Sequence, residues 1–73
     1  MINDLDILSV FNEIFHTNFT NIEITRDQMP QWDSMKHAEL IIKLQKKFKF
    51  HFKARDVSKI TSLSEIKHIM QKI

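Results

Sequence analysis

Residues 32–48 read WDSMKHAELIIKLQKKF and predict the clearest helix of the chain. At 100° per residue, one arc of this helix holds the side chains expected to face a core, which are His37, Leu40, Ile41, Leu44 and Phe48. Met35 and Ile42 fall on the opposite side. We therefore expect a surface helix over residues 34–49 that buries one face and exposes two apolar side chains on the other.

Helical spacing also predicts a first and a last helix. Residues 4–16 repeat apolar side chains at this spacing, and Asn3 or Asp4 can cap the first turn. The stripe consists of Leu5, Ile7, Leu8, Val10, Phe11, Ile14 and Phe15. Ser62 and Glu65 form the S-x-x-E pattern of a capping box. The apolar residues that follow at helical spacing are Leu63, Ile66, Ile69, Met70 and Ile73.

The segments between these helices lack a helical period. Residues 17–33 are rich in turn-forming residues but also contain apolar anchors, namely Phe19, Ile22, Ile24, Met29 and Trp32, so we expect an ordered loop. Residues 48–52, FKFHF, alternate like a short strand. Because no second strand is predicted nearby, we expect a helix end and a loop with its aromatic side chains packed inward. Residues 54–60 predict one short helical turn.

Composition narrows the class of protein. The predicted fold class is all-α, a small bundle of three main helices plus one short helix in a single domain over residues 1–73. The chain has no cysteine, which excludes disulfides and cysteine zinc sites, and no glycine, which excludes P-loops and dinucleotide fingerprints. Unbroken apolar runs reach only three residues, so we expect no transmembrane helix or signal segment. We expect a soluble, cytoplasmic monomer that does not bind membranes.

The two halves of the chain carry opposite charge. Residues 1–33 contain six acidic residues and one basic residue, whereas residues 34–73 contain three acidic and ten basic residues, so the halves are −5 and +7 and sum to +2. A basic half is typical of proteins that bind nucleic acid or an acidic protein. A solvated lysine-rich face accounts for the same charge, and both interpretations stay open.

Ser34 is the strongest candidate for a chemically functional residue. A hydrolase nucleophile requires a glycine-flanked turn, a base and an orienting acid, and His37 is expected to turn toward the core, so we do not expect catalysis. Asp33 or Ser34 can also serve simply as the helix cap. The four histidines are far apart in sequence without carboxylates at ligand spacing, so we expect no metal site.

Residues 33–73 resemble the acyl carrier protein family, including its peptidyl carrier relatives. Asp33, Ser34 and Met35 match the D-S-L element that begins the second helix of that family, with methionine in place of leucine. The other matching positions are Ala38, Glu39, Leu40, Ile41, Phe48, Phe52, Asp56, Val57, Ile60, Thr61, Ser62, Leu63 and Ile66. Trp32 and His37 also look like the W-D-S-x-x-H variant of stand-alone specialised carriers.

The resemblance implies that Ser34 carries 4′-phosphopantetheine, attached by a phosphopantetheinyl transferase. The thiol of that group would hold an acyl or aminoacyl cargo as a thioester and pass it between loading and accepting enzymes. A phosphodiester on Ser34 would lie at a helix N-terminus, which favours anions. Asp33 would cap the helix or help to present Ser34, and these two roles stay open.

The sequence departs from the family in the charge of this helix. Typical members present carboxylates there to basic partner enzymes, whereas this chain has lysines at most of those positions and keeps Glu39 as the main acid. Because charge complementarity sets partner choice, we expect a dedicated carrier of a specialised pathway with less basic partners. The expected docking residues are Met35, Lys36, Glu39, Ile42 and Lys46.

An alternative function is a small basic helical module that binds nucleic acid or an acidic protein. Its support is a run of basic residues with interleaved phenylalanines, comprising Lys43, Lys46, Lys47, Lys49, Lys53 and Arg55. Against it, so short a chain needs its phenylalanines for the core. A third reading is a carrier-like subunit that has lost its modification, which an intact Ser34 does not favour.

Overall fold

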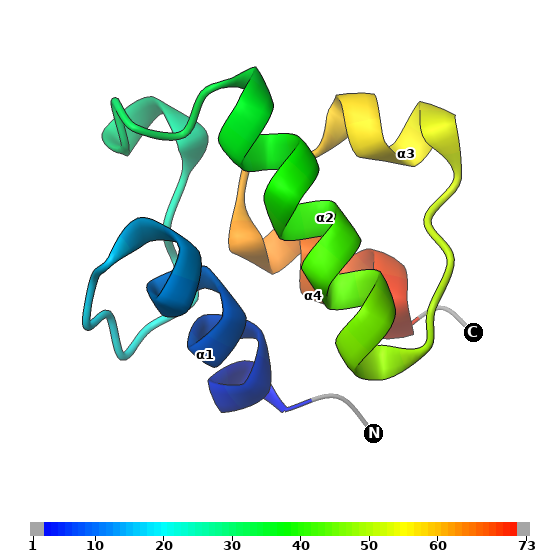
Figure 1. The fold of residues 1–73 in the computed structure, drawn as a ribbon, viewed down its shortest axis with the longest axis horizontal. Coiled ribbons are helices and arrows are strands. Elements are labelled where there is room, and N and C mark those ends of the chain that lie inside the picture. Colours follow the sequence, from blue (N-terminus) through cyan, green and yellow to red (C-terminus); the bar gives the residue numbers. More distant parts are fainter. Residues whose placement is uncertain (1–2, 72–73) are drawn as a thin grey trace.

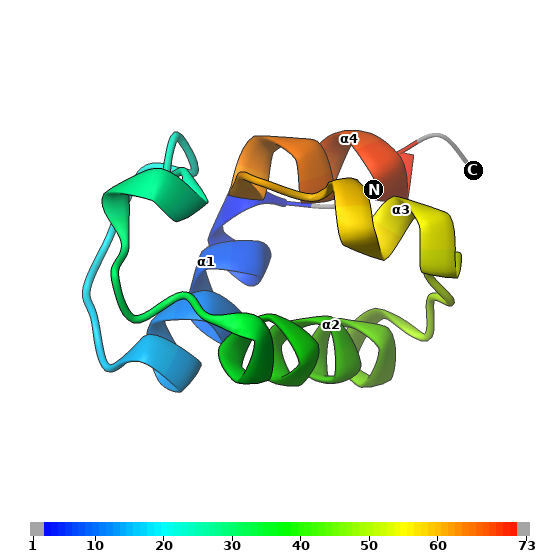
Figure 2. The ribbon, with the colours of Figure 1, turned by 90° about the horizontal axis from the view of Figure 1, so that it is seen from above.

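A computed structural model describes residues 3–71 and confirms the all-α fold class. Its elements are α1 (Asp4–Phe15), the 3₁₀ turn η1 (Arg26–Gln28), α2 (Ser34–Phe48), α3 (Ala54–Lys59) and α4 (Leu63–Gln71). Figures 1 and 2 show α2 and α4 on opposite sides of the molecule, with α1 and α3 at the two flanks of α2. Across the described residues, no helix combines the length and the apolar character needed to cross a bilayer. The bundle has three main helices and the short α3, as predicted.

The two longest helices begin at side-chain caps and end without glycine. The Asn3 and Asp33 side chains each accept a backbone N–H of the first turn of the helix that follows them. The helices end at His16 and Lys49, which adopt left-handed backbone angles with φ of 56° and 52°. A residue with a side chain costs roughly 1–2 kcal/mol in this conformation. Both helices therefore stop one residue earlier than the predicted ranges of residues 4–16 and 34–49.

The hydrophobic core collects one face of each main helix and several loop residues. Its buried members are Ile7, Leu8, Val10, Phe11, Ile14, Phe15, Ile24, Met29, Trp32, Leu40, Ile41, Leu44, Phe52, Ile60, Leu63, Ile66 and Met70. The prediction that Leu5 belongs to this stripe is wrong, since its side chain is 64% exposed. Leu5 precedes the buried Ile14 by nine positions, which is half a turn out of phase on a helix.

The long connection from residue 17 to residue 33 is ordered, as predicted. At its beginning, the Asn12 carboxamide oxygen accepts hydrogen bonds from the Thr17 hydroxyl at 2.8 Å and the Phe19 amide at 3.1 Å. Further along, backbone bonds tie it to the residues around the start of α4, with Leu63 N donating to Ile24 O at 3.1 Å. Figure 2 shows the connection crossing one end of the bundle to the start of α4 and returning to α2. The single turn η1 within it was not predicted, because three residues are too few to show a period.

The cap of α4 differs in detail from the predicted capping box. The Ser62 hydroxyl accepts the Glu65 amide at 3.2 Å, as the pattern requires. The Glu65 carboxylate, however, accepts the backbone amide of Thr61 at 3.0 Å instead of that of Ser62. Hydrogen bonds from the Thr61 hydroxyl and amide lower the pKa of Glu65. The predicted helix residue Ile73 lies outside the described residues.

The FKFHF segment is a helix end followed by a loop, as predicted. The Gln45 side chain accepts the Phe52 amide at 2.9 Å, which fixes the loop against the last turns of α2. Phe52 is buried, and its ring meets the Phe50 ring edge to face at a centroid distance of 4.8 Å. The alternation of aromatic residues therefore reflects packing against the end of α2.

Candidate functional site

Ser34 is the first residue of α2 and is exposed to solvent. Its sequence neighbours Asp33 and Met35 are exposed as well, so the hydroxyl stands on an open surface that another protein can approach. Among residues 3–71, no side-chain hydrogen bond involves the Ser34 hydroxyl. Burial or a hydrogen bond would make the hydroxyl less available to an external enzyme. The Ser34 hydroxyl is exposed and makes no such bond within residues 3–71.

The backbone around Ser34 is suited to an anion. The Asp33 carboxylate accepts the Lys36 amide at 2.9 Å, and the Asp33 carbonyl accepts the His37 amide at 2.8 Å. The Ser34 and Met35 amides precede the first intrahelical bond, and the first turn of α2 contains no acidic residue. The helix dipole contributes about 0.3–1 kcal/mol for a negative group at an exposed N-terminus. A phosphate ester on Ser34 therefore fits this position.

A buried polar chain fixes the start of α2 from the inside. The indole N–H of Trp32 donates to Nδ1 of His37 at 3.0 Å, and Nε2 of His37 contacts the Val57 carbonyl oxygen at 2.8 Å. Because Nδ1 accepts and a carbonyl cannot donate, the ring proton sits on Nε2. The Arg26 guanidinium adds a third bond, from Nε to the Trp32 carbonyl at 3.1 Å. These hydrogen bonds link the long loop, the first turn of α2 and α3.

His37 is therefore a structural histidine. Its ring is buried, as the helical period predicted, and both nitrogens are engaged by Trp32 and Val57. Neither nitrogen is left to activate the hydroxyl of Ser34, so these two residues do not form a nucleophile–base pair. The contact between Trp32 and His37 was missed by sequence reasoning, although the burial of both residues was expected. A loop tryptophan five positions before a core-facing histidine is the only signal that could have indicated it.

The outer stripe of α2 carries the two predicted apolar side chains. Met35 is 82% exposed and Ile42 is 50% exposed. Glu39 and Lys46 are exposed beside them. The predicted orientation of the helix is thus confirmed. Four of the five expected docking residues form one continuous solvent-facing surface that begins next to Ser34.

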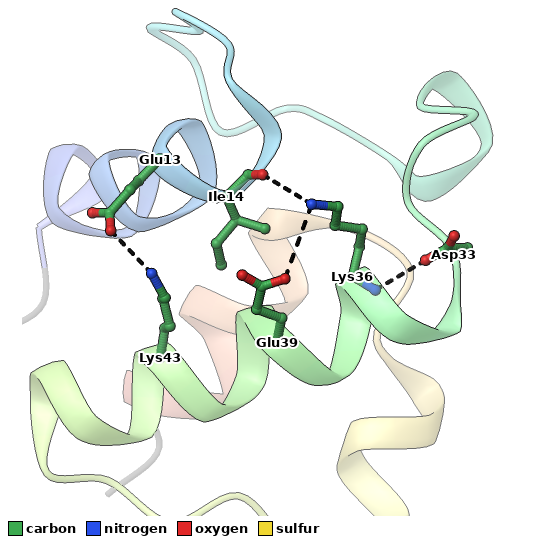
Figure 3. Close-up of polar contacts among 6 residues, drawn as sticks. All are labelled: Glu13, Ile14, Asp33, Lys36, Glu39 and Lys43. Atoms are coloured by element: carbon green, nitrogen blue, oxygen red, sulfur yellow. Dashed lines mark hydrogen bonds and ion pairs between the residues drawn. The ribbon is translucent and has the colours of Figure 1, made fainter.

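Lys36, the fifth expected docking residue, points toward α1 instead of along this stripe. Its ammonium donates to the carbonyl oxygen of Ile14 at 3.3 Å and lies 3.9 Å from the Glu39 carboxylate (Figure 3). The last turn of α1 contains no basic residue, so Lys36 supplies the cation that its terminal carbonyls attract. This half-buried side chain therefore joins α1 to α2.

An ion pair crosses the same helix–helix boundary farther from Ser34. The Lys43 ammonium lies 3.0 Å from the Glu13 carboxylate (Figure 3), and this contact lowers the pKa of Glu13. The pair borders an open groove of about 360 Å³ between α1 and α2, which we name the basic groove. Its lining residues are Val10, Glu13, Lys43, Lys46 and Lys47. The groove is thus lined by three lysines, one carboxylate, that of Glu13, and one apolar side chain, that of Val10.

Most of the predicted site residues lie on the exposed surface of α2, and one of them, Lys36, points toward α1 instead. Met35, Glu39, Ile42 and Lys46 form the outer stripe of α2, and Ser34 is exposed at its first residue. Lys36 bridges to α1, and Asp33 caps the helix, which is one of its two predicted roles. Within residues 3–71, no three histidine or carboxylate side chains gather as metal ligands would.

Comparison of the chain with protein-family models, with curated proteins and with solved structures found no match.

Proposed function

We propose that the protein is a carrier that holds an acyl or aminoacyl group on 4′-phosphopantetheine attached to Ser34. The observation that supports this most strongly is the exposed hydroxyl at the first residue of α2, which makes no side-chain hydrogen bond within residues 3–71. The first turns of α2 are hydrogen-bonded to the long loop and to α3. The likeness of the D-S-M stretch to the corresponding element of acyl carrier proteins supports the same function. We propose no catalytic role for the chain itself.

The attachment chemistry requires coenzyme A and an external transferase. The Ser34 oxygen would attack the phosphorus next to the pantetheine arm, forming one P–O bond while the bond to the other phosphate of the pyrophosphate breaks. Adenosine 3′,5′-bisphosphate would leave, and a base of the transferase would take the hydroxyl proton. Once bound, the group would supply the thiol that a chain without cysteine lacks.

The residues of this chain would hold and present the attachment point. Asp33 fixes the first turn through the Lys36 amide, so the serine side chain projects from a rigid helix end. Met35, Glu39, Ile42 and Lys46 would contact the enzymes that visit it, while Lys36 would act indirectly by holding α1 against α2. We further infer that the protein serves a specialised pathway, because its second helix is basic where typical carriers are acidic. A cytoplasmic monomer remains our expectation.

The test is intact-mass spectrometry of the full chain after incubation with coenzyme A and a broad-specificity phosphopantetheinyl transferase. The wild type should gain one phosphopantetheine group, and Ser34→Ala should gain none while keeping the same circular dichroism spectrum. Ser9→Ala, an exposed serine in α1, is the matched control and should be modified like the wild type. An unmodified wild type with several transferases that modify a reference carrier would refute carrier function.

A further inference from the structure

We propose that the transferase that modifies Ser34 docks with an acidic surface on the basic groove and the outer stripe of α2. This inference rests on the proposed function and adds to it the chemistry of the partner. The partner would place carboxylate side chains over Lys46 and Lys47 and an apolar pocket over Met35 and Ile42. Three observations support this proposal: the lysines without ion pairs, the exposed apolar side chains, and the width of a standard protein interface compared with the distance from Ser34 to Lys46.

Unpaired positive charge collects at the end of α2 that is remote from Ser34. The ammonium of Lys36 contacts the Ile14 carbonyl and the Glu39 carboxylate. The ammonium of Lys43 contacts the Glu13 carboxylate. Lys46 and Lys47 lie in the last turn of α2 and make no ion pair among the described residues. With Glu13 counted, the groove keeps two positive charges in excess. A basic partner would be repelled there, whereas carboxylates would be attracted and association accelerated.

A protein that docks along the outer stripe of α2 beside Ser34 also covers Lys46, which lies on that stripe and lines the groove. Lys46 follows Ser34 by twelve positions, which is about 18 Å along a helix axis. A standard protein interface buries about 800 Å² on each partner, which corresponds to a patch about 28 Å across. The distance from the serine to the groove is shorter than that patch. Charge at the groove therefore influences the enzyme that acts on the serine.

The apolar side chains favour a protein over a nucleic acid as the occupant. Met35, at 82% exposure, and Ile42, at 50%, lie on the same stripe between Ser34 and the groove. Exposed side chains of this type become binding anchors when a partner protein supplies a pocket for them. A phosphate backbone has no such pocket, and it would meet the carboxylate of Glu39 on the same surface. An acidic protein surface satisfies both features.

The experiment measures kcat/KM for modification of Ser34 at increasing ionic strength, with intact mass as the readout. It uses two purified transferases, one with an acidic and one with a basic carrier-facing surface. The acidic one should be faster at low salt and should slow as salt rises. The double variant K46E/K47E should lower its kcat/KM about tenfold at low salt and should raise that of the basic transferase.

The matched control is K53E/K59E, which changes the net charge equally but alters exposed lysines at the two ends of α3, its N-cap Lys53 and its last residue Lys59. It should leave both rates within about twofold of the wild type, because neither lysine lines the basic groove or the outer stripe of α2. Thermal unfolding must show that both variants remain folded. Equal losses in the two double variants would mean that only net charge matters, and would overturn the docking proposal.

Other outcomes separate this proposal from the proposed function. No modification by either transferase would refute the carrier function and with it the docking surface. Modification of Ser34 at rates that ignore both salt and K46E/K47E would refute only the docking surface. Retention on heparin that K46E/K47E abolishes, together with unchanged modification rates, would assign the groove to polyanion binding and would also overturn the proposal.

Discussion

The two sides of α2 differ in how their side chains are buried and paired. On the inner side, the ring nitrogens of His37 are matched by Trp32 and Val57 and the apolar neighbours are buried. On the outer side, Met35 and Ile42 remain in water, although fully burying such a side chain is worth about 1.5–3 kcal/mol. The difference indicates a division of labour within one helix. The inner side fixes the start of α2, and we propose that the outer side contacts a partner.

The largest effect on this comparison should come from Trp32→Ala. Trp32 is 3% exposed and packs edge to face against Phe11 at a centroid distance of 5.5 Å. Truncating a buried tryptophan costs about 3–5 kcal/mol, which is most of the stability expected for a domain of this size. Urea unfolding followed by circular dichroism should show a partly unfolded variant even without urea. Met35→Ala on the outer side should change the unfolding free energy by less than about 0.5 kcal/mol. Equal midpoints for the two variants would remove the distinction between the sides.

His37→Leu should have the next largest effect. It leaves the Trp32 N–H and the Val57 carbonyl without their partners, and an unsatisfied buried group costs about 1–3 kcal/mol. We expect a loss of about 2 kcal/mol and faster amide hydrogen exchange in α3, which loses its bond to α2. His51→Leu, at an exposed loop histidine, is the control and should leave both unchanged. An unaltered exchange pattern in α3 would show that the polar chain does not link the helices.

Glu13→Gln should have the smallest effect, and that effect should depend on pH. The ammonium of Lys43 donates a hydrogen bond to the Glu13 carboxylate and lowers its pKa in the folded state. A lowered folded pKa stabilises the fold above the unfolded pKa, and this contribution is lost as pH falls through the folded value. The variant should therefore have a slightly lower Tm at neutral pH and the same Tm as the wild type in acid or in molar salt. Glu23→Gln, at an exposed loop carboxylate that makes no ion pair among the described residues, is the control, and equal changes in Tm for the two variants would assign no role to the ion pair.

The helices whose apolar residues recur at helical spacing over many positions were predictable from the sequence. Fifteen residues of α2 hold a steady apolar period, so its position and the exposure of Met35 and Ile42 followed from spacing alone. Its end was less predictable, because Lys49 adopts a left-handed conformation that usually signals glycine. Leu5 was misplaced because a stripe defined by spacing has ill-defined edges.

Contacts that depend on how the elements sit in space could not be predicted. Lys36 was assigned to a docking surface from its position on α2, yet the end of α1 lies close enough to engage its ammonium. The basic groove likewise exists only because Glu13 of α1 faces the lysines of α2. The exposure of Ser34 was implied by its place at a helix start, whereas the hydrogen bond to His37 in the first turns of α2 depends on a loop residue, Trp32.

The most direct test of the central claim is to locate the modification within the chain. Trypsin should release residues 27–36, DQMPQWDSMK, in which Ser34 is the only hydroxyl-bearing side chain. After reaction with coenzyme A and a transferase, mass spectrometry should show this peptide shifted by one phosphopantetheine group, with the other serine-containing peptides unchanged. A shift on any other peptide, or an unshifted peptide from a chain exposed to several active transferases, would contradict the account.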